Sequence, residues 1–248
     1  MEHRIVGTTM PVLEMQLQPG ESIVAESGEL SWMSAAVQLQ TSTKMATNSG
    51  GAFGRLKRMV GGGGLFMTEY TAQGGAGMVA FAAKLPGQIF PMDVAPGVGY
   101  MAHRHGFLCA TPGVEISLGF QQKLGAGIFG GEGFVLQKIE GQAQVFIELS
   151  GEVVTYELGA GDTLRVHPGH VGLFQDSVSF TITTVPGIKN KLFGGDGLFL
   201  AALTGPGKVW LQSMPLANLA HAIQPYLPQP QGNSGGSAGG LIGGLLGS

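Results

Sequence analysis

Apolar and polar residues alternate along much of this chain. In the clearest run, Val178, Phe180 and Ile182 are separated by serine and threonine. A period of two indicates a strand that buries one face. The same alternation, with the apolar members expected to face inward, recurs at Leu13, Met15 and Leu17, at Val37 and Leu39, at Val114, Ile116 and Leu118, and at Ala143, Val145, Ile147 and Leu149. Pro-Gly and Ser-Gly turns separate these runs, so the pattern predicts an all-β sandwich or barrel.

A motif of about twenty residues is repeated along the chain. The stretch FGGEGFVLQKIEGQAQVFI at 129–147 returns as FGGDGLFLAALTGPGKVWL at 193–211, and a looser copy lies at 61–81. Gly133 and Gly197 of the first two copies are 64 residues apart.

The segments upstream of each copy repeat as well. The turn glycines Gly97 and Gly161 show the same 64-residue spacing, whereas the first unit is longer and carries an insertion. Three diverged copies of one supersecondary unit explain this spacing. We predict a single domain over 1–228, with repeat units at about 11–82, 88–148 and 153–212 related by pseudo-threefold symmetry.

Two short helices are predicted beside the strands. One is GAFGRLKRMV at 51–60, inside the insertion of the first unit. The other lies within 213–227, where Ser213 is expected to cap the helix, Pro215 to occupy its first turn and Pro225 to end it. Its apolar positions at helical spacing are Leu216, Leu219, Ala220 and Ile223. The stretch 229–248 is rich in Gly and Ser, and its composition predicts a flexible tail.

Charge and cysteine content limit the classes of function. Net charge is −3 with only 13 Lys and Arg, and no cationic cluster of the kind that binds nucleic acid is visible. Cys109 is the single cysteine, which excludes an intramolecular disulfide and a cysteine-based zinc cage. A cytoplasmic location is the expectation, because the N-terminus also lacks the apolar stretch of a signal peptide. No segment reaches the ~20 apolar residues of a membrane span, although LIGGLLGS at 241–248 has the composition for peripheral contact with a membrane or a partner.

The Gly-Gly-acid-Gly motifs at Glu132 and Asp196 have two interpretations. Glycine-rich backbone can bind a phosphate, but such a loop normally leads into a helix and supplies a lysine. Here each motif leads into an expected strand and carries a carboxylate. We therefore expect tight β-turns in which the carboxylates accept hydrogen bonds from turn amides.

Three residues are the candidates for a metal site. His103 and His167 are 64 residues apart and occupy equivalent positions of two units, and Glu26 occupies that position in the first unit. Two histidines and one carboxylate form a recognised ligand set. They converge only if they face a common axis, so we expect surface or turn histidines, no cofactor and no bound transition metal. Cys109, in an apolar setting, is expected to be a buried and inert thiol, and no catalytic residue is assigned.

Several motifs together resemble the altered-inheritance-of-mitochondria family, also called the mitochondrial biogenesis or TRAP-like family. They are LPGQIFPMDVAPG, LGAGIFGGEGFVLQKIEG, LRVHPGHVGLF and LFGGDGLFLAALTGPGKVWLQS. The resemblance covers roughly residues 5–212 and implies a β-sandwich-like fold related to the tryptophan RNA-binding attenuation protein. Two positions depart from the expected pattern, Gly63 in place of an acidic residue and His167 in LRVHPGH, so no site is carried over.

Three functions follow as hypotheses. The first is a non-enzymatic, self-assembling β protein, a homo-oligomer with a trimer as the leading expectation, which binds a protein partner or scaffolds a complex. The second is a metal-dependent enzyme or ligand binder that uses Glu26, His103 and His167. The third is an RNA-binding module by analogy of fold, which the charge balance opposes.

Overall fold

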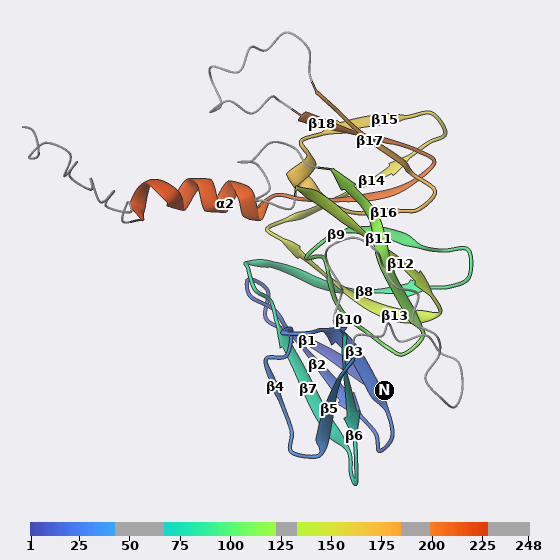
Figure 1. Cartoon of the computed structure of the whole chain (residues 1–248), viewed down its shortest axis with the longest axis vertical. Coiled ribbons are helices and arrows are strands. Elements are labelled where there is room, and N and C mark those ends of the chain that lie inside the picture. The colour runs from blue at the N-terminus through green and yellow to red at the C-terminus, as the bar shows by residue number, and fades with distance from the viewer. Residues whose placement is uncertain (43–66, 123–132, 185–198, 228–248) are drawn as a thin grey trace, which may run out of the picture.

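The structure is a computed structural model that describes residues 1–42, 67–122, 133–184 and 199–227. Nearly all of its described elements are antiparallel strands, so the prediction of an all-β fold is confirmed. The predicted helix at 51–60, Glu132, Asp196 and the tail lie outside the described residues. The molecule is elongated, and its sheets follow one another in a row along the long axis (Figure 1). The N-terminal third lies at one end of this row, and strands β15, β17 and β18 lie at the other (Figure 1).

Nineteen strands are described, and after the first they fall into three units of six. The first unit follows β1 (Glu2–Val6) and contains β2 (Val12–Leu17), β3 (Ser22–Glu26), β4 (Trp32–Met33), β5 (Val37–Ser42), β6 (Met67–Ala72) and β7 (Gly77–Ala82). The second contains β8 (Gly87–Val94), β9 (Tyr100–His103), β10 (Phe107–Ala110), β11 (Val114–Gln122), β12 (Phe134–Gly141) and β13 (Ala143–Ser150). The third contains β14 (Val153–Leu158), β15 (Thr163–Val166), β16 (Val171–Gln175), β17 (Ser179–Thr184), β18 (Phe199–Thr204) and β19 (Gly207–Gln212).

The strands form four sheets. Sheet 1 has the order β1-β2-β7-β4, sheet 2 β5-β6-β3-β10-β13-β8, sheet 3 β11-β12-β9-β16-β19-β14 and sheet 4 β15-β18-β17. Adding six to each strand number of sheet 2 gives the order of sheet 3, so each middle sheet joins half of one unit to half of the next. This recurrence of pairing is a property of the described strands, whereas pseudo-threefold symmetry about one axis stays a prediction.

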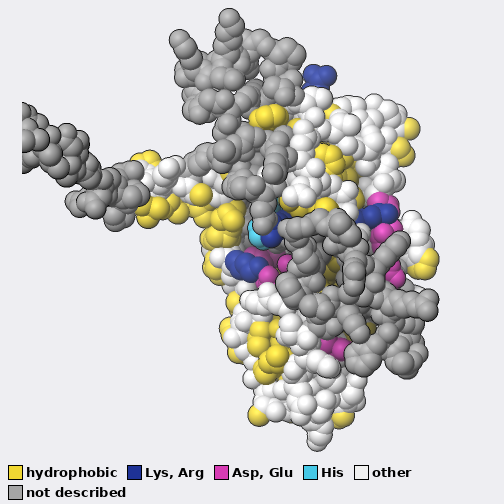
Figure 2. All heavy atoms as spheres, in the orientation of Figure 1, with side chains coloured by type: hydrophobic (Ala, Val, Ile, Leu, Met, Phe, Trp, Pro, Cys, Tyr) yellow, Lys and Arg dark blue, Asp and Glu magenta, His cyan; other side chains and the backbone are white. Residues whose placement is uncertain are grey.

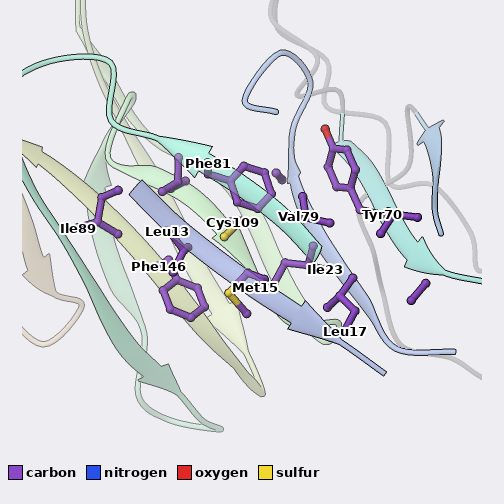
Figure 3. Packing of buried hydrophobic residues seen from close by; sticks show 14 of the residues in the cluster. Leu13, Met15, Leu17, Ile23, Tyr70, Val79, Phe81, Ile89, Cys109 and Phe146 are labelled. Carbon is purple, nitrogen blue, oxygen red and sulfur yellow. The ribbon is translucent and has the colours of Figure 1, made fainter. Parts of the chain in front are cut away.

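Three clusters of buried apolar side chains fill the spaces between neighbouring sheets. Cluster 1 holds Leu13, Phe81 and Phe146 between sheets 1 and 2, and Figure 3 shows their side chains converging from strands of both sheets. Cluster 2 joins sheets 2 and 3 through residues such as Ile147 and Leu173, and cluster 3 joins sheets 3 and 4. Sheets 2 and 3 are therefore covered on both faces, while the outer faces of sheets 1 and 4 have no further sheet against them among the described residues.

Two predicted inward positions are wrong. Leu39 on β5 is 51 % exposed because β5 is the edge strand of sheet 2. Leu118 on β11 is exposed because a register shift between Leu118 and Phe120 changes which side chains face the core, and Phe120 packs against cluster 3 instead.

The C-terminal helix is confirmed in position but not in its cap. Helix α2 spans Leu216–Ile223 and is followed by the 3₁₀ turn η2 (Gln224–Tyr226). Pro215, not Ser213, is the cap residue, and no side-chain hydrogen bond caps the helix. The Ser213 hydroxyl instead accepts a hydrogen bond from the backbone N–H of Glu152 at 2.8 Å, which ties the chain before α2 to the start of the third unit.

Candidate functional site

A cavity of about 280 Å³ lies where the three units and α2 meet. Lys84, from the connection between β7 and β8, lines it together with His103 at the end of β9 and Glu148 of β13. The third unit contributes Gln212 at the end of β19, and α2 contributes Leu216. In Figure 2, histidine, cationic and anionic side chains gather at mid-height of the molecule, beside the base of α2. We call this feature the junction cavity.

The charged groups at the junction cavity have partners, in one case a backbone N–H and in the other an opposite charge. Glu148 is 7 % exposed, and its Oε1 accepts a hydrogen bond from the backbone N–H of Lys84 at 2.8 Å. Burial raises the pKa of Glu148, and the Lys84 backbone bond and ammonium charge partly offset that rise. The Lys84 ammonium forms an ion pair with Glu29, whose side chain is largely buried. These contacts fix the connection between the first two units, because each buried charge needs a partner.

Gln212 holds the third unit against the second. Its Oε1 accepts a hydrogen bond from the backbone N–H of Ser150 at 3.1 Å, and its Nε2 donates to the carbonyl of Gly169 at 3.1 Å. Gly169 belongs to the 3₁₀ turn η1 (Pro168–His170), and His170 Nδ1 lies 2.8 Å from the Gln212 carbonyl oxygen. The side chain thus satisfies buried backbone groups of two units at once.

His103 is the candidate metal ligand that reaches the junction cavity. Burial, together with the nearby charges of His105 and Arg104, lowers the pKa of its imidazole from 6.5 to about 4. Protein atoms surround the ring on most sides, although part of its surface faces the cavity. Its ring centroid lies 5.8 Å from that of His105 and 6.1 Å from that of Phe134. His103 is therefore neutral at neutral pH and can present either a donor or an acceptor to the cavity.

Glu26 and His167 are not among the residues that line the junction cavity. Glu26, the last residue of β3, accepts a hydrogen bond from Gln137 Nε2 at 2.5 Å, and burial raises its pKa. His167 follows β15 in the third unit, its ring centroid is 5.9 Å from that of His170, and burial lowers its pKa.

The structure does not assemble the predicted ligand set. Glu26 is the last residue of β3, His103 is the last residue of β9 and His167 directly follows β15, so the three occupy corresponding places in successive units. Among the described residues, no three His, Cys, Asp or Glu side chains are arranged to hold a metal ion. Cys109 is fully buried in cluster 1, and burial raises the pKa of its thiol well above its usual range, which fits the expected unreactive thiol.

Sequence analysis missed Lys84, Glu148 and Gln212. One signal for Glu148 was present, since it is a carboxylate in the otherwise apolar run VFIEL at 145–149. Its partner is the backbone of Lys84, 64 residues away in the chain, and nothing local in the sequence identifies that contact.

The junction cavity offers binding groups rather than an assembled reaction centre. A small cavity with mostly apolar walls and a few converging polar groups suits a small, partly apolar molecule. Leu216 supplies an apolar wall, while His103 and Lys84 supply polar groups.

The fold and this junction define a class of all-β proteins built from stacked antiparallel sheets. Within the part of the chain that the structure describes, no helix is both long and apolar enough to cross a bilayer. The chain belongs to the family described as Mitochondrial biogenesis AIM24, whose model matches residues 3–214, and the resemblance inferred from the motifs is therefore confirmed.

Two streptococcal proteins are similar over nearly the whole chain. An uncharacterized protein of Streptococcus pyogenes serotype M6 is 25% identical over 224 residues, which cover 88% of this chain and 87% of that protein. The crystal structure of protein SPYM3_0169 from Streptococcus pyogenes superposes with a TM-score of 0.70 at 22% identity, over 91% of this chain and 99% of that one. This second likeness establishes a shared fold.

Proposed function

We propose that this chain is a non-enzymatic β protein that self-assembles and acts as a scaffold or partner-binding protein. A cytoplasmic location and a protein partner are parts of the same proposal. The observation that carries it is the amount of large apolar surface left exposed on a chain in which only 12% of residues are charged.

Exposed apolar side chains lie on strands as well as on the helix. Trp32 is 46 % exposed on β4, and Val154 and Tyr156 are 46 % and 43 % exposed on β14. Helix α2 projects sideways from the row (Figure 1), contains no acidic, Lys or Arg residue, and exposes Leu216 and Ile223. Large exposed apolar patches usually mark interfaces, and soluble homo-oligomers usually close symmetrically. The trimer expected from the sequence is one such closed assembly.

The mass of the protein in solution tests this proposal. We expect the full chain to be an oligomer by light scattering, and a chain that ends at residue 229 to keep the same mass and melting temperature. The Gly- and Ser-rich composition of 230–248 leaves little apolar area to stabilise an interface, which is why its removal is expected to be neutral. A full chain that stays monomeric at every concentration would disprove self-assembly, and loss of the oligomer on truncation would assign the interface to the tail.

A further inference from the structure

We infer that a second copy of this chain adds end to end, by pairing β15 of one copy with β4 of the next. This inference rests on the proposed self-assembly and names its interface. It follows from how the units join inside the chain: the second strand of one unit pairs with the third strand of the next, as β3 with β10 and β9 with β16.

The register of the two internal junctions is the same. Ala25 is opposite Cys109 at the first junction, and Ala102 is opposite Leu173 at the second. Cys109 and Leu173 are 64 residues apart, and each also pairs with the last strand of its own unit, opposite Phe146 and Trp210. The chain therefore forms one specific junction twice.

At the two ends of the row, each half of this junction lacks a partner strand. Among the described strands, β4 pairs only with β7, and β15 pairs only with β18. Strand β1 lies at the opposite edge of sheet 1, so no described strand pairs with the outer edge of β4. Although β4 has only two residues, the first internal junction also pairs only two residues of each strand. The third junction would place Trp32 opposite Val166 and Met33 opposite Arg165 of the neighbouring copy.

Trp32 is exposed at a position that the other two units bury. Trp32 is opposite Ala80 on the last strand of its unit. Cys109 and Leu173 are opposite residues of the last strands of their own units, Phe146 and Trp210. Trp32, Cys109 and Leu173 therefore occupy corresponding positions. Cys109 and Leu173 are fully buried, in clusters 1 and 2, because a preceding unit covers them. Among the described residues no other unit covers Trp32, and this large aromatic side chain is 46 % exposed.

The opposite end exposes the complementary apolar surface. Leu13 and Met15 of the first unit are buried in cluster 1, and Phe90 and Met92 of the second pack against cluster 2. In each unit the first strand pairs with the last, as β2 with β7, β8 with β13 and β14 with β19. The registers of these pairs show that Val154 and Tyr156 of the third unit occupy the corresponding positions.

In the first two units these positions share a cluster with residues of the next unit. Cluster 1 contains Cys109 and Phe146 of the second unit, and cluster 2 contains Leu173 of the third, with Trp210 packed against it. Val154 and Tyr156 of one copy would accordingly pack beside Trp32 of the next copy and bury all three side chains. Aromatic anchors that become fully buried dominate such interfaces.

The contact is heterologous, because the two surfaces are different, and it therefore forms a ring or an open row. Two variants block opposite ends at exposed positions: Trp32→Glu blocks the β4 end, and the double substitution Val154→Glu with Tyr156→Glu blocks the β14–β15 end. Leu39→Glu, on the exposed edge strand β5, is the matched control. Circular dichroism of each variant checks that it folds.

The test measures mass by light scattering, alone and after mixing. Each blocked variant alone is expected to be a monomer, Leu39→Glu to keep the wild-type mass, and an equimolar mixture of the two blocked variants to form a dimer and nothing larger. The mixture succeeds because each partner retains the end that the other lacks. An oligomeric wild type whose mass neither variant reduces, or a mixture that stays monomeric, would overturn this interface while leaving self-assembly in place. A monomeric wild type would overturn both.

Discussion

Gly141→Ala is expected to abolish stable folding or to cost on the order of 4 kcal/mol, the range reached only when a specific structural conflict is created. Gly141 ends β12, and only Gln142 separates it from the start of β13, so the chain passes here from sheet 3 to sheet 2. Its φ is +110°, where side chains are disfavoured, and an added Cβ would lie 2.1 Å from the carbonyl oxygen of Gly113. Since that oxygen belongs to the backbone of a neighbouring loop, the conflict cannot be relieved by a side-chain rotation.

Gly97→Ala is the matched control for this substitution. Gly97 also has a positive φ, +82°, but no heavy atom lies within 4 Å of the added Cβ. It should lose only the backbone preference, about 1–2 kcal/mol. Urea denaturation of both variants measures the difference, and equal losses would contradict the steric explanation.

His103→Gln is expected to flatten the fall in stability of the protein between pH 6.5 and pH 4. Burial depresses the pKa of His103 from 6.5 to about 4. Within this window the unfolded chain binds a proton that the folded chain does not, so stability decreases as pH falls and the loss is complete below the folded pKa. The shift corresponds to about 3 kcal/mol at most, and glutamine removes the titration while keeping a polar group.

Two buried carboxylates titrate in the opposite sense, whereas His105 at the junction cavity titrates in the same sense, because burial also lowers its pKa. Burial raises the pKa of Glu26 and of Glu148, so protonation of these carboxylates stabilises the folded chain as pH falls. They are present in both proteins, and the difference between wild type and His103→Gln isolates the imidazole. Denaturation at pH 7 and pH 4 measures it, with His3→Gln at an exposed position as the control. Parallel profiles for wild type and His103→Gln would show that the buried imidazole does not govern this window.

Local patterns in the sequence predicted the strands well but not the covering of their faces. Leu13, Met15 and Leu17 alternate and are all buried, as expected. On β13 the alternation assigned Ala143, Val145, Ile147 and Leu149 to the interior, yet Phe146 between them is also fully buried. The reason is that β13 lies in sheet 2, which has clusters 1 and 2 on its two faces. Alternation of apolar and polar residues indicates that one face of a strand is buried. It does not indicate whether a second sheet also covers the opposite face.

The candidate site was harder to predict because it forms between units. The spacing of 64 residues identified corresponding positions, including His103 and His167, but among the described residues these positions do not form a group that could hold a metal ion. The junction cavity instead depends on long-range contacts, such as Gln212 with Ser150. The strand pairing contains information that alternation lacks, because it identifies Trp32 as an exposed residue at a position buried in the other two units.

The central claim is that the junction between units continues from one copy to the next, and a disulfide between copies tests it most directly. Met33→Cys and Arg165→Cys are made in separate chains, because the internal junctions place these two positions opposite each other, as Ala110 with Val24 and Phe174 with Met101. Directly opposed residues of antiparallel strands have Cα atoms about 4.5–5.5 Å apart, within the range that a disulfide spans. The native Cys109 is buried and does not compete.

After oxidation of the mixed chains, mass spectrometry of the proteolysed product identifies which cysteines are joined. We expect a disulfide between positions 33 and 165 of different copies in the mixture, and far less of it when Leu39→Cys replaces Met33→Cys. An oligomer in solution that yields no such disulfide, or yields as much with the Leu39→Cys chain, would contradict the account.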